Sequence, residues 1–245
     1  MAINKNSNGF TFGFAVVMVI VVGALLATAA LALKAPQQEN VKQEKMQNIL
    51  GAIQIETPRS EAPKLFQQYV KERIVISYDG QVVSTNTGEI VVTDKQDGFN
   101  IDVKKQFKSV KNIEDRVYPY YVCEKDGETF YVIPMVGKGL WGPIWGFVAL
   151  ESDYNTIYGA TFDHKTETPG LGADIKEDFF EKQFAGKKIF KDGKYVSVDV
   201  MKGGAPAGNE HGVDAITGGT ITSVGVANML QNTLEVYAKY FKTQS

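Results

Sequence analysis

The chain has 245 residues, enough for one domain with a hydrophobic core and little more. Its 26 basic and 28 acidic residues nearly balance, so we expect no broad basic face for nucleic acid. One cysteine, Cys123, and two histidines, His164 and His211, exclude a disulfide framework and disfavour a metal site. Any redox chemistry must therefore come from a bound cofactor.

The first predicted element is a transmembrane helix at residues 10–33, after a short tail at residues 1–9. This run of 24 residues carries no charge. As a helix it would be about 36 Å long, which exceeds the roughly 30 Å hydrocarbon core of a bilayer. A cleaved signal peptide is the alternative, because Ala27-Thr28-Ala29 looks like a cleavage site. The run is longer than the apolar core of a signal peptide, so we expect a retained single-pass anchor.

The middle of the chain changes from helix-prone to strand-prone. Residues 34–72 are polar and predict a helical spacer, with helices at 34–50 and 62–71. From residue 73 to residue 245 we expect one domain. Its predicted strands are 75–78, 82–84, 120–124, 129–136, 144–150, 156–163 and 195–200.

Turn and cap signals complete the fold prediction. Asp79-Gly80 and the tetrapeptide 125–128 each separate two strand-like runs, which is typical of β-hairpins. Asp174 followed by Glu177 predicts a helix cap, and the apolar residues up to Phe184 predict a helix after it. Because strands and helices do not alternate regularly, we predict an α+β fold.

The last segment predicts an amphipathic helix preceded by a glycine-rich turn. After Thr222 the apolar residues recur at spacings of three and four, namely Val226, Leu230, Leu234, Tyr237 and Phe241. Thr220 would therefore stand beside a helix N-terminus, where free N–H groups and about half a positive charge favour a phosphate. Gly218 and Gly219 would let the backbone come close to such a group.

The residues 214–220 resemble the flavinylation signature of the FMN-binding domains, Asp-x-x-Ser/Thr-Gly-Ala-Thr, whose last threonine is esterified to the phosphate of FMN. Asp214, Thr217, Gly218 and Thr220 match this pattern. Gly219 departs from it, because alanine is usual there, but both residues are small. The resemblance implies a covalent FMN on Thr220 as a phosphoryl threonine, and hence redox chemistry that no side chain here supplies.

Two further segments resemble one subfamily. Residues 137–150 contain Gly-Lys-Gly-Leu-Trp and end in Gly-x-x-Ala-Leu, and residues 164–172 contain Glu-Thr-Pro-Gly-Leu-Gly. With the N-terminal anchor, they resemble the C subunit of the sodium-translocating NADH:quinone oxidoreductases. The flavin contacts that this resemblance implies are Gly139, Leu140, Trp141, Glu167, Thr168, Leu171, Ile221 and Thr222.

The glycine-rich segment at residues 137–142 and the tryptophans Trp141 and Trp145 have other interpretations. Residues 137–142 have the spacing of a dinucleotide-binding turn, but Pro143 and Gly146 interrupt the helix that such a turn must open. We therefore do not expect direct NADH binding. Trp145 is predicted to pack in the core, whereas for Leu140 and Trp141 packing and flavin contact are equally open.

Three smaller features have both a functional and a structural interpretation. Thr168-Pro169-Gly170 predicts a type II turn that projects Glu167, Thr168 and Leu171 to one side of a rigid loop, and a plain connecting turn is the alternative. His164 could donate a proton to reduced flavin, but a lone histidine is more often structural, so we expect a structural role. Cys123 lies in a strand-like stretch and is expected to be a small buried apolar residue.

The resemblance implies a membrane-anchored electron relay. Its FMN would pass electrons between an iron–sulfur centre and the flavin of another subunit, contributing to NADH oxidation, ubiquinone reduction and sodium export. The partners would be the other subunits and, during maturation, a Mg-dependent flavin transferase that uses FAD. The chain alone should neither turn over NADH nor transport sodium, since its one apolar run has no charge to form an ion path.

The family places its soluble domain on the periplasmic side of the bacterial inner membrane, and we expect the same topology here. The lysines favour the opposite orientation, since only Lys5 precedes the run while Lys34, Lys42 and Lys45 follow it. Two alternatives remain. One is the G subunit of the related ferredoxin:NAD oxidoreductase, which shares the flavinylation motif, and the other is an anchored assembly protein without a cofactor.

Overall fold

The computed structural model describes residues 7–242, so residues 1–6 of the predicted tail lie outside it, as do residues 243–245. The chain divides into two compact units at the boundary between Glu44 and Lys45, and each unit is described by itself.

The first unit is made by the helix α1 (Asn8–Ala52), which has 45 residues and continues into the second unit. Pro36 lies inside this helix without ending it, so the predicted anchor and the first predicted spacer helix form one continuous helix. Among the described residues, α1 is the one helix that is long and apolar enough to cross a bilayer, judged by length and composition. This agrees with the predicted single span.

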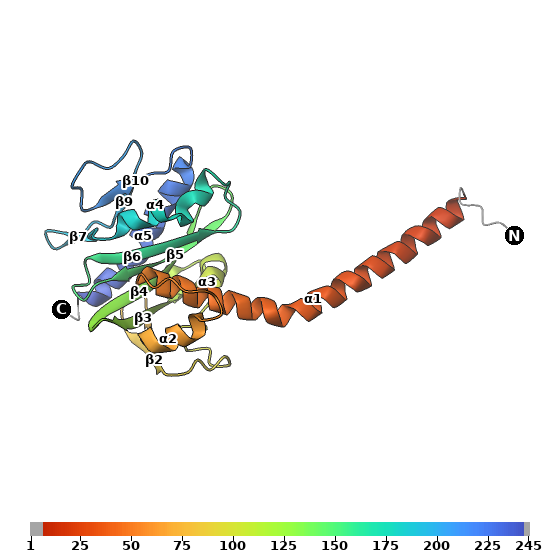
Figure 1. Ribbon diagram of the computed structural model, residues 1–245, viewed down its shortest axis with the longest axis horizontal. Coiled ribbons are helices and arrows are strands. Elements are labelled where there is room, and N and C mark those ends of the chain that lie inside the picture. Colours follow the sequence, from red (N-terminus) through yellow and green to blue (C-terminus); the bar gives the residue numbers. More distant parts are fainter. Residues whose placement is uncertain (1–6, 243–245) are drawn as a thin grey trace. The chain divides into compact units, whose positions relative to one another are not determined.

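The second unit is built on a six-stranded antiparallel sheet in the order β2-β1-β3-β4-β5-β6 (Figure 1). Its strands are β1 (Val70–Ser77), β2 (Val82–Thr87), β3 (Val117–Lys125), β4 (Glu128–Lys138), β5 (Pro143–Leu150) and β6 (Ile157–His164). Two small sheets lie beside it, formed by β7 (Phe190–Lys191) with β8 (Lys194–Tyr195) and by β9 (Asp199–Met201) with β10 (Gly212–Asp214). Both predicted hairpins are confirmed, as β1 turns into β2 and β3 into β4.

The sheet has a hydrophobic core on each face. The long helix α5 (Thr220–Phe241) packs on one face, where Ile133 and Val148 meet its Val226 and Leu230. The end of α1 and the helix α2 (Ala62–Tyr69) pack on the other face, together with Phe130 (Figure 1). Successive strand residues alternate between the two cores, as the strand period of two requires. The predicted α+β class is confirmed.

Residues 45–72 belong to the folded unit, although the sequence predicted them as a spacer. Ile49 and Phe66 are buried in the second core. Lys45 donates hydrogen bonds from its Nζ to the carbonyls of Phe99 and Ile101, and burial lowers the pKa of Lys45 to about 8. The end of α1 is therefore part of the domain.

Two predicted elements are broken in the structure. The helix expected after Asp174 is three short pieces, η2 (Gly172–Lys176), α4 (Asp178–Glu181) and η3 (Lys182–Phe184). Asp174 does not cap a helix, because its Oδ1 accepts a hydrogen bond from the N–H of Gly170. The strand expected at 195–200 is interrupted between β8 and β9 by Ser197, which has a φ of 62°. Four further elements were not predicted. They are α3 (Val103–Ser109), η1 (Ile113–Asp115), β7 and β10.

Candidate functional site

Thr220 is the first residue of α5, whereas the sequence predicted it just before a helix that begins near Thr222. Gly219 occupies the N-cap position and no side chain caps the helix, so the first-turn N–H groups of α5 are available to an anion. Gly218 has a φ of 76°, a conformation that glycine adopts without strain, and turns the chain into the helix. Thr220 is half-buried, and its hydroxyl makes no hydrogen bond with any described residue. The result is a free hydroxyl at the positive end of a helix.

A side chain of α5 stabilises the turn that precedes this helix. The N–H of Ile216 donates to Oγ of Ser223 at 3.1 Å, and the N–H of Gly219 donates to the carbonyl of Ile216 at 3.0 Å. Ser223 is fully buried. The role of Ser223 was not predicted, although a serine on the apolar face of the predicted helix is a signal that could have indicated it.

Glu167 joins three segments that are distant in the sequence. Its carboxylate is almost fully buried and accepts hydrogen bonds from the N–H of Trp141 at 2.8 Å and of Gly142 at 3.2 Å. On the other oxygen it accepts a bond of 2.6 Å from the hydroxyl of Thr222. The β4–β5 loop, the loop after β6 and the first turn of α5 therefore meet on one carboxylate.

Glycines make room for this carboxylate. A Cβ on Gly139 would lie 2.6 Å from Oε1 of Glu167, and a Cβ on Gly172 would lie 2.7 Å from Oε2. Both distances are too short for any side chain. Gly139 and Gly172 are therefore the residues that allow the Glu167 carboxylate to lie this close to the backbone. The buried Glu167 and Thr222, both predicted as flavin contacts, position the loops.

The loop after β6 has the predicted type II turn. The N–H of Leu171 donates to the carbonyl of Thr168 at 3.1 Å, and Gly170 has a φ of 75°. At the start of this loop, Nδ1 of His164 accepts a hydrogen bond from the N–H of Glu167 at 3.1 Å. This contact shows that His164 supports the loop at its first residues.

Four apolar side chains are exposed on the three segments that Glu167 joins. We call them the apolar rim: Leu140, Trp141, Leu171 and Ile221, which are 47%, 67%, 41% and 60% exposed. The backbone of Leu171 lies against Gly219, since a Cβ added to that glycine would be 3.1 Å from the Leu171 carbonyl. Exposed apolar side chains gathered beside a free hydroxyl and a helix N-terminus suit a ligand with flat apolar faces and a phosphate.

The remaining motif residues lie on the surface. Asp214 ends β10, and its Oδ1 accepts from the N–H of Ala205 at 2.7 Å while its own N–H donates to Gln183. Thr217 and Gly218 are exposed in the turn. Asp214 thus fixes the neighbouring loop, and the motif is open to an external protein.

Other residues considered from the sequence have structural roles. Trp145 is half-buried, with Nζ of Lys104 3.1 Å from its ring centre, so its predicted core packing was wrong in part. Cys123 is fully buried and burial raises the pKa of its thiol, which confirms the predicted burial. Residues 137–142 lead from β4 into β5, so no helix follows and a dinucleotide-binding turn is excluded. Within residues 7–242, no group of three or more acidic, histidine or cysteine side chains could hold a metal.

The comparisons with known proteins agree with this geometry. The FMN-binding domain family model matches residues 139–235, which include both loops and most of α5. The C subunit of the Na(+)-translocating NADH-quinone reductase from Vibrio alginolyticus is 31% identical over 230 residues, which cover 92% of this chain and 90% of that protein. The chain belongs to this C-subunit family.

Further members of the C-subunit family support the assignment. The protein from Yersinia pestis is 31% identical over 92% of this chain and 88% of its own length. The crystal structure of the family member from Parabacteroides distasonis has a TM-score of 0.76 and 40% identity, covering 87% of this chain and 98% of that one. NqrC from Shewanella oneidensis has a TM-score of 0.66 and 28% identity, with 83% and 98% covered.

Proposed function

We propose that this chain is the membrane-anchored flavoprotein subunit of a sodium-translocating NADH:quinone reductase and that Thr220 carries FMN as a phosphoester. The observation that supports this most directly is the free hydroxyl of Thr220 at the uncapped N-terminus of α5. It lies within the region that matches the FMN-binding family. The C-subunit relatives favour this function over the G subunit of the ferredoxin:NAD complex or an assembly protein.

The residues of the site would divide the work of holding the cofactor. When bound, FMN supplies the redox chemistry. The Oγ1 of Thr220 provides the ester oxygen, and the first-turn N–H groups of α5 offset part of the phosphate charge. The apolar rim excludes water from the ring, and Glu167 with Thr222 keeps the loops in place.

Attachment would require a flavin transferase with FAD as donor. In that step Oγ1 of Thr220 forms a bond to the phosphorus of the FMN moiety, the hydroxyl proton leaves, and AMP departs from the same phosphorus. Three residues beside Thr220 are exposed, namely Asp214, Thr217 and Gly218. A transferase could therefore bind them on the surface of the folded domain. We propose that they form its recognition element.

The chain would act as a relay between other subunits. We propose that α1 spans the bacterial inner membrane once, that the domain lies on the periplasmic side, and that electrons pass through the FMN between neighbouring redox centres. A covalent ester prevents loss of the cofactor in a compartment without free FMN. NADH oxidation, ubiquinone reduction and sodium export would be properties of the complex.

Replacement of Thr220 by valine tests this proposal, because it removes the hydroxyl at nearly constant volume. Thr220→Val should leave no flavin on the chain in a denaturing gel and an intact mass without FMN, while the melting temperature stays unchanged. Thr217→Ala is the control and should keep some flavin. In the complex, Thr220→Val should block NADH-driven quinone reduction but not NADH oxidation by artificial acceptors. Flavin that still co-migrates with Thr220→Val contradicts the assignment.

A further inference from the structure

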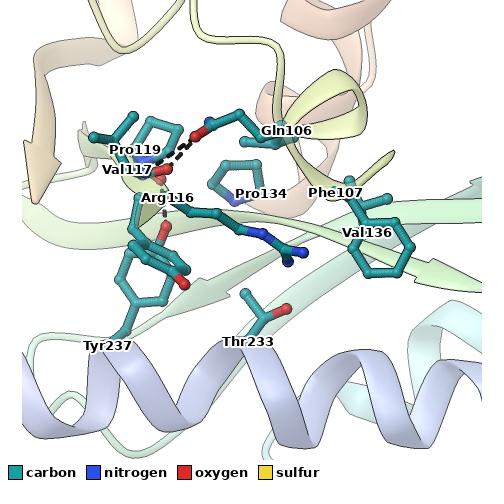
Figure 2. A pocket seen from close by; sticks show the side chains of 11 residues that line it. Gln106, Phe107, Arg116, Val117, Pro119, Pro134, Val136, Thr233 and Tyr237 are labelled. Atoms are coloured by element: carbon teal, nitrogen blue, oxygen red, sulfur yellow. Dashed lines mark hydrogen bonds between the residues drawn. The ribbon is translucent and has the colours of Figure 1, made fainter. Parts of the chain in front are cut away.

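A pocket lies between α3, β3, β4 and α5 (Figure 2). Its volume is about 60 Å³, and Phe107, Pro134 and Val136 form its apolar walls. Thr233 lines it from α5, thirteen residues after Thr220 and therefore about 20 Å further along the helix. The pocket is thus separate from the proposed flavin site.

Most polar groups around this pocket already have partners. The side-chain amide of Gln106 donates to the carbonyl of Val117 and accepts from its N–H, at 3.3 and 3.0 Å. The hydroxyl of Tyr237 donates to the carbonyl of Pro119 at 2.7 Å. Thr233 is different, because its hydroxyl has no hydrogen-bond partner among residues 7–242.

Arg116 supplies a charge that no carboxylate neutralises. Its Nε and Nη2 donate to the carbonyl of Val110 at 3.0 and 2.7 Å, which fixes the guanidinium. Figure 2 shows the guanidinium extending into the pocket on the side of Thr233 and Phe107. In the described part of the chain no carboxylate forms an ion pair with Arg116. A cation and a hydroxyl therefore converge in an apolar pocket, which suits a carboxylate.

The segment of residues 103–117, which supplies part of the pocket lining, is basic in an otherwise acidic protein. Residues 103–117 contain two acidic side chains, Glu114 and Asp115, and five basic ones: Lys104, Lys105, Lys108, Lys111 and Arg116. The segment therefore has a net charge of +3, whereas the whole chain has −2. Basic charge that extends beyond the pocket favours a ligand that is longer than the pocket and carries several negative charges.

We propose that this pocket docks an acidic segment of a partner subunit. One aspartate or glutamate carboxylate binds Arg116 and Thr233, a neighbouring apolar side chain packs on Phe107, and further acidic residues face the lysines. The volume holds a single side chain and is far below the roughly 300–1,000 Å³ of small-molecule sites. The inference rests on the proposed function, under which the chain is one subunit of a complex.

Site-specific crosslinking in the assembled complex tests the docking surface. A benzoylphenylalanine in place of Phe107, which is 40% exposed at the pocket, is photo-activated in the purified complex, and the product is mapped by mass spectrometry. The expected product is a peptide of a partner subunit that contains an acidic residue next to an apolar one. The same probe at Lys191, an exposed position in β7, is the control and should not give this product.

Charge reversal tests the role of Arg116. Arg116→Glu should lower the Phe107 crosslink by at least about tenfold, as expected for loss of a desolvated charge pair, and arginine at the mapped partner acid should restore it. Thr233→Leu fills the pocket without changing the charge, so it should also lower the yield of the Phe107 crosslink. This variant tests the docking surface if Arg116→Glu does not fold. Lys191→Glu should leave it unchanged.

Several results contradict the docking proposal. They are a Phe107 product confined to this chain or to lipid, a partner peptide without acidic residues, and a small carboxylate found in the pocket by native mass spectrometry. Flavin on Thr220 is measured in the same samples. A complex that keeps its flavin and quinone reductase activity but gives no crosslink overturns the docking surface alone, whereas a chain without flavin overturns the proposed function.

Discussion

The hydroxyl of Thr222 donates a hydrogen bond of 2.6 Å to the carboxylate of Glu167, which lies 55 positions earlier in the chain. Both side chains are buried. The bond connects the loop after β6 to the first turn of α5, so the two segments are fixed as one. The position of Thr220 therefore depends on two residues that expose almost no surface.

Removal of the Thr222 hydroxyl should loosen this connection. Thr222→Val leaves the Glu167 carboxylate without one charge-assisted hydrogen bond, so we expect the free energy of unfolding to fall by about 1.5–3 kcal/mol. Urea unfolding of the detergent-solubilised chain measures the change. Thr93→Val, the same substitution at an exposed threonine, should change it by less than about 0.5 kcal/mol. Equal effects of the two variants would contradict the role assigned to Thr222.

The two glycines before Thr220 should respond differently to alanine. Gly219 has a φ of −100°, and a Cβ at this position would lie 3.1 Å from the Leu171 carbonyl, which is mild crowding. Alanine also lowers the conformational entropy of the unfolded chain, and this gain of about 0.4–1 kcal/mol offsets the crowding. Gly218 has a φ of 76°, and its Cβ would lie 2.6 Å from Cδ2 of Leu171. We expect Gly218→Ala to lower the melting temperature clearly and Gly219→Ala to change it little. The reverse order in thermal unfolding contradicts this geometry.

Glu181 should make stability depend on pH. Its Oε1 accepts a hydrogen bond from the N–H of Phe162, and burial, together with the nearby carboxylates of Asp178, Asp163 and Glu177, raises the pKa of Glu181 to about 8. The folded chain therefore keeps a proton that the unfolded chain loses above pH 4.5. The stabilisation from this group is complete below about pH 4.5 and is lost as the pH rises through 8.

Glu181→Gln tests this dependence, because glutamine keeps the hydrogen-bond acceptor but has no proton to lose. The variant should unfold at a similar urea concentration to the parent at pH 5 and at a higher one at pH 8.5. Glu128→Gln replaces an exposed carboxylate at the start of β4 and is the control. The difference in urea midpoint between this variant and the parent should be the same at pH 5 and pH 8.5. Parallel pH profiles of parent and Glu181→Gln rule out a protonated Glu181.

A buried ion pair should hold the long loop between β2 and α3. Arg73 donates to both oxygens of Asp97, with Nη2 2.8 Å from Oδ2, and both side chains are almost fully buried. Arg73→Met leaves an unpaired buried charge, so we expect a loss of about 3–5 kcal/mol in unfolding free energy. The double variant Arg73→Met with Asp97→Leu should lose less than the sum of the single variants. Additive losses would show that the pair is not coupled.

Local signals were enough to predict much of the fold. Asp79-Gly80 and residues 125–128 specify tight hairpins by themselves, and the apolar spacing after Thr222 specifies α5. The helix pattern from Thr222 onward predicted Thr220 just before α5, and the structure places it at the first residue of that helix. The flavin contacts proposed for the three motifs came from the resemblance and stay a prediction.

Long-range contacts could not be predicted from the sequence. Nothing near Glu167 in the chain indicates that its partners are Trp141 and Thr222, because only the folded sheet brings these segments together. The helix expected after Asp174 is broken at Glu177, whose backbone is extended, and the Asp174 carboxylate bonds to the loop at Gly170. The pocket at Arg116 combines four separate elements, so no local pattern indicates it.

The order of elements along the chain has a consequence for biogenesis. Thr220 follows all six strands of the large sheet and is the first residue of the helix that packs on them. When the ribosome has just added this residue, the rest of α5 does not yet exist and cannot orient the hydroxyl. Under the proposed attachment, loading at Thr220 would therefore wait until the helix has been synthesised and has docked on the sheet. The flavin content of a preparation would then report the fraction of molecules that have matured.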